Sequence, residues 1–333
     1  MTLETSIGNV AQNKIYHGNH ANQIPALEAS SMPRYITSLL ANNPHRFGTI
    51  LALLGVLVLT PDTLVIRLSG LERWALMGWR GVLMGAMSLL LWRLFLSQNP
   101  RGEWRSLASW QGLLVISAFS MNSATFTLGI VETSATVVLT AVATMPIFAA
   151  ILSFFMLGER QGWLGWLAIT TAMCGVVIVV MDGGNAIGSP DGSVLLGGIF
   201  GVLTAAGLAL TFTMARKYND LGILPAAALG AMISGFIGLF LSDISTITNV
   251  PLWTVLTMGL VILPISFTCL NLAPRYTSSA IVSLLMLLEM VIGPFWVWLG
   301  VGEQPTMIMI AGAGFVALVL TLHILRTQWF SGS

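Results

Sequence analysis

The chain has 333 residues, of which 56% are hydrophobic and 8% are charged, and its formal net charge is +1. A soluble domain carries about 25% charged residues, so this composition excludes a water-soluble globule and indicates a membrane protein with several spans. The small net charge and the scattered basic residues argue against a nucleic-acid partner. Cys174 and Cys269 lie in apolar runs, and with the four histidines they show no spacing typical of a metal site or a cofactor site.

Residues 1–45 are polar and lack apolar periodicity, so we expect a flexible tail there, with a second short tail at 329–333. Between them lie apolar runs of the length, about 20 residues, that a helix needs to cross the bilayer core. The sequence predicts an all-α membrane protein with ten transmembrane helices, near residues 48–67, 75–96, 110–130, 134–157, 162–181, 195–215, 223–242, 252–272, 279–300 and 306–326.

The lysines and arginines predict the orientation of these helices. If the N-terminus is cytoplasmic, eleven of the 14 basic residues fall in inner segments, and only Arg67 and Arg73 fall in outer loops, while Arg80 lies within the second span. Loops on the cytoplasmic side carry an excess of basic residues. We therefore expect an integral protein of the plasma (inner) membrane with both termini in the cytoplasm.

The chain also contains an internal repeat. The segment ETSATVVLTAVATMPIFAAILSFFMLGER begins at Glu132, and YTSSAIVSLLMLLEMVIGPFWVWLGVGEQ begins at Tyr276, at an offset of 144 residues. The same offset predicts two five-helix units, 46–190 and 191–328. Because five is odd, the second unit begins on the opposite face of the membrane from the first. Inverted repeats of this kind are typical of secondary transporters, although channels also use them.

The ten-span plan, the Thr-Ser-Ala entry at residues 133–135 and the Leu-Gly-Glu-Arg exit at residues 157–160 resemble the EamA family of the drug/metabolite transporter superfamily. The resemblance covers roughly residues 48–326. It implies a ten-helix carrier that moves small metabolites, often exporting amino acids, around a cavity lined by both halves. Where members often have Glu-Pro in the fourth span, this chain has Met145–Pro146, and the ninth span has Glu289–Met290.

Glu289 is the first candidate for a substrate-binding or proton-binding residue, because it lies near the middle of an apolar span. A charge there costs about 2.5–3.5 kcal/mol on insertion scales. Met286, Gly293 and Trp296 share its helical face, and we expect Trp296 to cap the space that Gly293 leaves. The alternative is a protonated carboxyl group that bonds to a neighbouring helix.

Asp62 and Arg80 are the next candidates. Asp62 follows Pro61, which interrupts the helical hydrogen-bond ladder, so its side chain could line a cavity or pair with Arg67 near the surface. Arg80 could hold a substrate carboxylate, pair with Asp62, or extend towards the outer headgroups.

Three uncharged residues complete the predicted site. Asn122 and Ser266 are 144 residues apart, each near the middle of its span, as a site between two repeats requires. Thr140 is the centre of a stripe formed with Thr136 and Thr144. The alternative for all three is that they bond within or between helices.

We therefore expect a secondary transporter, and favour an exporter, of an amino acid or a related amphipathic solute. The expected partners are the solute, the lipid bilayer and a coupling proton, with no cofactor. A passive channel on the same scaffold is the alternative. Motifs of catalytic histidine clusters, G-x-S-x-G nucleophiles and phosphate loops are missing from the sequence, so we predict that the protein is not an enzyme.

Overall fold

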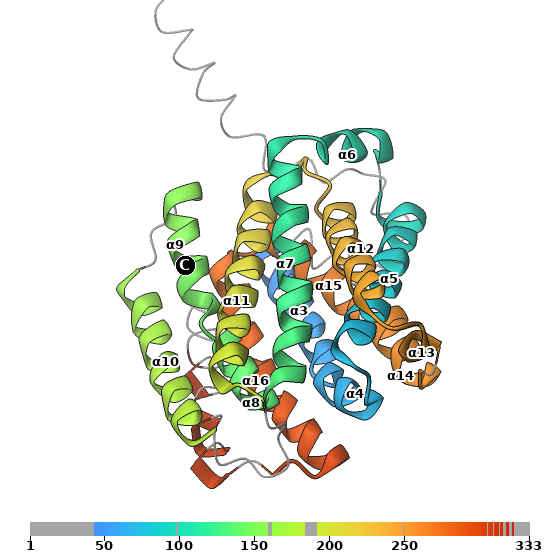
Figure 1. Ribbon diagram of the computed structural model, residues 1–333. Coiled ribbons are helices and arrows are strands. Elements are labelled where there is room, and N and C mark those ends of the chain that lie inside the picture. The colour runs from blue at the N-terminus through green and yellow to red at the C-terminus, as the bar shows by residue number, and fades with distance from the viewer. Residues whose placement is uncertain are drawn as a thin grey trace, which may run out of the picture. The chain divides into compact units, whose positions relative to one another are not determined.

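Helices make up the regular structure of the described residues, as the computed structural model shows (Figure 1). These residues are 43–97, 99–158, 162–183, 192–248, 250–304, 306–308, 310–312, 314–315, 318–319 and 322. The chain divides into two units, Met1–Pro44 and His45–Ser333, and nearly all of the described residues belong to the second. The predicted tails, at 1–45 and 329–333, lie almost wholly outside the described residues.

The elements follow one another without a strand between them in the described part of the chain. They are α3 (Pro44–Leu59), α4 (Asp62–Ser69), α5 (Arg73–Leu91), η2 (Trp92–Leu96), α6 (Pro100–Ser106), α7 (Trp110–Glu132), α8 (Ala135–Val142), α9 (Met145–Leu157), α10 (Trp163–Gly183), α11 (Val194–Lys217), α12 (Ile223–Leu241), α13 (Ile244–Thr248), α14 (Leu252–Leu256), η3 (Thr257–Ile262), α15 (Leu263–Leu272), η4 (Ala273–Arg275) and α16 (Ser279–Val301).

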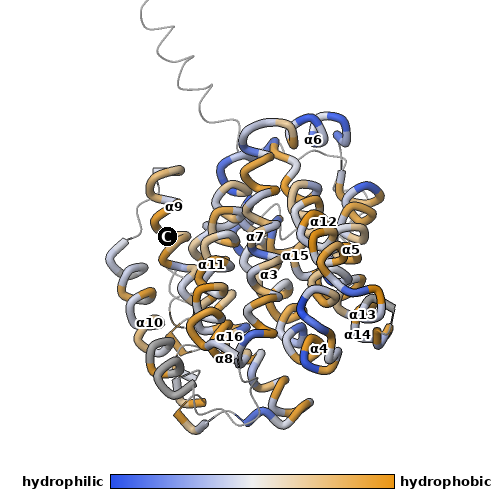
Figure 2. Tube along the Cα trace, in the orientation of Figure 1, coloured by the Kyte–Doolittle hydropathy of each residue, from blue (hydrophilic) through white to orange (hydrophobic). Residues whose placement is uncertain are grey.

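Eight helical stretches among the described residues are long and apolar enough to cross a membrane. They coincide with eight of the ten predicted spans, and hydrophobic residues colour much of their Cα trace in Figure 2. The predicted fifth span corresponds to α10, in which the apolar part is the shorter stretch Gly165–Gly175. Much of the predicted tenth span, 306–326, falls outside the described residues. The chain is thus an all-helical membrane protein.

Several spans are not continuous α-helices, and in three of them the interruption lies beside a proline. The first span breaks at Thr60–Pro61, between α3 and α4, and the fourth breaks just before Met145–Pro146, between α8 and α9. The eighth span contains the π-helix η3 immediately before Pro264. Proline has no backbone N–H to donate, which explains the interrupted ladders. By contrast, Pro294 lies inside the continuous helix α16.

The second and seventh spans pack against each other through glycines. A Cβ atom at Gly81 of α5 would lie 2.5 Å from the carbonyl oxygen of Ala231 and 2.7 Å from Cα of Gly235 in α12. A Cβ at Gly238 would lie 2.6 Å from the nitrogen of Gly78. Earlier residues of α5 thus meet later residues of α12, so the two helices run antiparallel with their backbones in contact.

The fourth and ninth spans also cross antiparallel. The hydroxyl oxygens of Ser153 in α9 and Ser279 in α16 lie 2.8 Å apart. At the other end of the pair, a Cβ at Gly293 would lie 2.8 Å from Cδ1 of Leu139 in α8.

The connections between spans gather at two ends of the bundle, alternately along the chain. At one end, Gly222 N–H donates to Ser106 Oγ at 3.0 Å, and Arg216 donates to the carbonyl oxygen of Arg275 at 3.3 Å. At the other end, Arg73 pairs with Glu132 at 3.4 Å. We call these the α6 end and the α4 end, after the helices that lie there in Figure 1.

Candidate functional site

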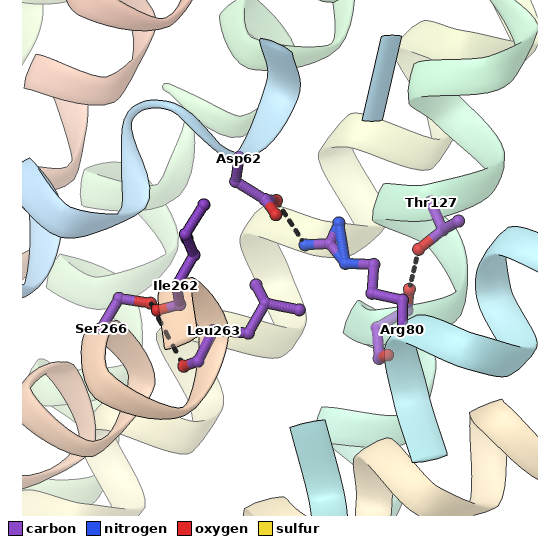
Figure 3. Close-up of polar contacts among 7 residues, drawn as sticks. Asp62, Arg80, Thr127, Ile262, Leu263 and Ser266 are labelled. Carbon is purple, nitrogen blue, oxygen red and sulfur yellow. Dashed lines mark hydrogen bonds and ion pairs between the residues drawn. The ribbon is translucent and has the colours of Figure 1, made fainter. Parts of the chain in front are cut away.

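A buried ion pair joins the first and second spans. The break at Pro61 starts α4 at Asp62, whose side chain is fully buried. It points at Arg80 of α5, and Arg80 Nη2 lies 2.7 Å from Asp62 Oδ2 (Figure 3). Arg80 is itself only 6% exposed. Each charge offsets the desolvation of the other, so the pair can exist in a place where neither ion alone would be stable.

The rest of the Arg80 guanidinium faces a different environment. Its central carbon lies over the ring of Phe126, 4.9 Å from the centroid, which is the geometry of a cation–π contact. Its Nη1 atom is buried and has no hydrogen-bond partner. One arm of the planar fork is therefore held by Asp62, while the other arm is free to bind an acceptor.

Glu289 brings a second carboxyl group to the same place. It lies in α16, is 2% exposed, and its Oε1 atom has no hydrogen-bond partner. The one ion pair of Arg80 among the described residues is with Asp62. A carboxylate with no counter-ion of its own is expensive in the bilayer, so Glu289 is suited to take up a cationic group or a proton.

Arg80 and Glu289 line one cavity in the middle of the bundle. Its volume is ≈ 20 Å³ in this conformation, room for about one water molecule, so a solute would fit only after the surrounding helices move apart. The lining residues come from both halves of the chain and are mostly apolar: Leu59, Arg80, Met84, Phe119, Asn122, Ser123, Phe126, Val142, Leu208, Phe267, Met286 and Glu289. An apolar wall with a few polar groups at fixed places is the usual form of a small-molecule site.

Asn122 supplies an uncharged polar group to the cavity. It lies in α7 and is 3% exposed. The next residue, Ser123, also lines the cavity, and its hydroxyl accepts a hydrogen bond from Ser234 at 2.8 Å. The structure thus brings Arg80, Glu289 and Asn122 together, with Asp62 directly behind Arg80.

The other predicted residues lie elsewhere. Ser266 is buried and donates back to its own helix, to the carbonyl oxygen of Ile262 at 2.6 Å (Figure 3). Trp296 is 38% exposed and donates from Nε1 to Thr60 Oγ1 at 3.1 Å, so it contacts the break in the first span rather than the cavity. Thr140 is buried and its hydroxyl has no partner, but it is not among the lining residues.

Arg67 does not pair with Asp62. Its Nη2 donates to the carbonyl oxygen of Thr133 at 2.9 Å, and its Nε lies 3.6 Å from Glu303 Oε2. The pair closes the α4 end, where the first, fourth and ninth spans meet. Burial raises the pKa of Glu303, although the nearby Arg67 and the Ala135 amide act in the opposite direction.

Most of the apolar lining could not be predicted from the sequence. Met84, Phe119, Phe126 and Phe267 are apolar residues in apolar spans, which is also the pattern of residues that merely pack helices. The charged residues indicate only that each needs a partner nearby. Phe126, whose ring lies under the Arg80 guanidinium, is a partner that was not predicted from the sequence.

Comparison with known proteins supports a carrier. Residues 46–181 match the model of the EamA-like transporter family. This match over residues 46–181 agrees with the resemblance read from the sequence and points to a membrane transporter.

A solved structure described as "Crystal structure of protein" has the same fold. It superposes with a TM-score of 0.64 over 85% of this chain and 98% of that chain, at 11% sequence identity. No curated protein sequence matches the chain.

Proposed function

We propose that this EamA-like protein is a secondary transporter of a small zwitterionic solute with an apolar side chain, such as a neutral amino acid. The observation that carries the proposal is the cavity that holds a free guanidinium arm of Arg80 and a free carboxyl oxygen of Glu289 within mostly apolar walls. A solute carboxylate would bind Arg80, and its ammonium would bind Glu289. The apolar side chain would lie against Met84, Phe119 and Phe126.

Two helix pairs support an inverted repeat. By the 144-residue offset, α5 is the counterpart of α12, and α8–α9 is the counterpart of α16. Each helix packs antiparallel on its counterpart, as a twofold axis in the membrane plane requires. Ser153 contacts Ser279, and the 144-residue offset makes Ser279 the counterpart of Ala135. Residues 153 and 135 lie nine positions on either side of residue 144, so the contact is centred on that residue.

A second contact has the same centre. Leu139 lies against Gly293, the counterpart of Ala149, and residues 139 and 149 both lie five positions from 144. The axis would therefore pass beside Thr144 and Leu288, one residue before Met145 and Glu289. The unpaired acid of this chain is thus next to the axis, where a site shared by both orientations of the carrier should lie.

This arrangement supports alternating access. Rocking of one repeat against the other would open the cavity first at one end and then at the other. When the cationic group of the solute leaves, Glu289 would be neutralised by a proton, and this exchange would couple solute movement to a proton gradient. With both termini in the cytoplasm the α6 end faces inward, and we favour export.

The binding test compares three related molecules. L-Leucine has both charged groups, whereas 4-methylpentanoate lacks the ammonium and 3-methylbutylamine lacks the carboxylate. We expect L-leucine to raise the Tm of the purified protein more than either analogue, because a ligand that prefers the folded state stabilises it. The Glu289→Gln variant should lose this preference over 4-methylpentanoate. Equal shifts for all three molecules, or none across the neutral amino acids, would contradict the proposed solute class.

A passive channel on the same scaffold remains the second candidate, because its cavity could have the same lining. The two functions differ in accumulation, since only a coupled carrier concentrates solute above equilibrium.

A further inference from the structure

A second cavity lies next to the first one, towards the α6 end. Its lining includes Ser88 of α5, Leu224 and Ala228 of α12, and Thr268 and Asn271 of α15. Its volume is ≈ 10 Å³ in this conformation, so a solute can enter only when the neighbouring side chains move apart. Each of three lining residues lies closer to the α6 end of the bundle than the central cavity does. They are Ser88, Leu224 and Asn271.

Two side chains separate the two cavities. Met84 and Phe267 line both of them, so they form a partition one side chain thick. Phe267 is fixed by an edge-to-face contact with Phe119, whose ring centroid is 5.3 Å away. A methionine has three rotatable side-chain bonds, so Met84 can move aside with little disturbance of the backbone.

Asn271 carries an unused acceptor in the second cavity. It is 1% exposed, and its Nδ2 donates to the carbonyl oxygen of Phe267 at 2.8 Å. This hydrogen bond fixes which end of the amide is oxygen. The Oδ1 atom is buried without a partner. A buried acceptor left unpaired is costly, so the cavity is prepared for a hydrogen-bond donor.

We propose that this cavity is a second solute-binding position, in which Asn271 Oδ1 accepts a hydrogen bond from the ammonium group of the solute before or after the solute passes Met84 and Phe267. The hydroxyl groups of Ser88 and Thr268 add further acceptors for the same ammonium. The proposal rests on the proposed transport function, which supplies the zwitterionic solute.

The position that the 144-residue offset relates to this one is not polar in the same way. The 144-residue offset relates Ser88 to Met232, Thr268 to Ala124 and Asn271 to Thr127. The hydroxyl group of Thr127 already donates to the carbonyl oxygen of Ser123 at 3.0 Å. The three counterpart positions thus carry no amide acceptor like Asn271 Oδ1, and we infer that a solute waits at the α6 end of the path. This asymmetry gives a nearly symmetric carrier a preferred loading side.

The test measures the reactivity of a cysteine in the second cavity. The background is the full chain with Cys174→Ala and Cys269→Ala, and Ser88→Cys is the reporter. Two methanethiosulfonates of similar size are compared on purified protein, one with an aminoethyl group and one with a sulfonatoethyl group. Met232→Cys, at the counterpart position, is the matched control.

We expect the ammonium reagent to react faster than the sulfonate reagent at Ser88→Cys, because hydrogen bonds to charged groups are the strong ones. The ratio of the two reaction rates should be about tenfold larger at Ser88→Cys than at Met232→Cys. Adding Asn271→Leu should remove this preference, and Asn271→Ala serves if the leucine variant does not fold. Equal preferences at the two cysteines, or a preference that survives both Asn271 variants, would mean that the cavity holds water only and would overturn the proposal. Because the readout needs no transport, it is separate from the outcome of the L-leucine binding test.

Discussion

Ser153 and Ser279 join two helices that occupy the same place in the two halves of the sequence, and their hydroxyl oxygens lie 2.8 Å apart. The contact lies at the end of α9 and the start of α16. Under the proposed twofold relation, Ala135 and Val297 form the mirror pair at the other end of the same crossing.

These two pairs predict opposite responses in cross-linking. In a background without Cys174 and Cys269, the double variant Ser153→Cys/Ser279→Cys should form a disulfide that blocks transport until it is reduced. The variant Ala135→Cys/Val297→Cys should cross-link more readily in the opposite orientation of the carrier. Addition of solute should therefore change the two cross-linking rates in opposite directions. Rates that rise or fall together would contradict rocking about this crossing.

The ion pair of Asp62 and Arg80 should be strongly coupled in stability. Asp62→Asn or Arg80→Gln leaves one buried charge without its partner, and we expect each to lower the unfolding free energy by about 3–5 kcal/mol. The double variant should lose less than the sum of the single losses, by at least about 1 kcal/mol in thermal unfolding in detergent. Arg105→Gln, at an exposed arginine, is the control and should change little. Strict additivity would show that the pair does not act as a unit.

The glycine contact between α5 and α12 should be intolerant of a methyl group. A Cβ at Gly81 would lie 2.5 Å from the Ala231 carbonyl oxygen, so Gly81→Ala must push the helices apart. We expect a loss of about 1–3 kcal/mol, as in overpacked cores. Gly198→Ala is the matched control, because its Cβ would meet nothing within 4 Å. A Gly81→Ala protein as stable as the Gly198→Ala protein would contradict the backbone contact.

Eight of the predicted spans agree with the structure because a run of about 20 apolar residues has few alternatives to a membrane helix. The internal breaks were harder to place. Proline at positions 61, 146, 264 and 294 indicates kinks equally well in the sequence, yet α16 passes Pro294 without interruption. Whether neighbouring groups can compensate for the lost hydrogen bond depends on tertiary packing.

The charged part of the site was easier to predict than its walls. An acid or an arginine in a span is expensive, so Asp62, Arg80 and Glu289 stand out from their surroundings. The choice of Arg80 rather than Arg67 as the partner of Asp62 depends on how helices pack, which the sequence does not state. Trp296 was predicted to cap the cavity, but its indole is used by Thr60.

Glu303 should make stability depend on pH. Burial raises its pKa in the folded protein above the ordinary value of 4.5, so the folded state holds this proton more tightly than the unfolded state does. Stability should therefore fall as the pH rises from about 4.5 through the folded-state pKa. Glu303→Gln should flatten this part of the profile of Tm against pH, whereas Glu72→Gln, at an exposed residue, should not. A Glu303→Gln profile that falls as steeply as the wild-type profile would contradict the burial of this carboxyl group.

We propose that Glu289 couples solute to protons in a cavity between two inverted repeats. The most direct test is uptake of radiolabelled L-leucine into proteoliposomes under an imposed proton gradient. We expect accumulation above equilibrium by the wild-type protein and by Glu72→Gln, and its loss in a folded Glu289→Gln protein. Accumulation that persists in Glu289→Gln, or wild-type uptake that stops at equilibrium, would contradict it.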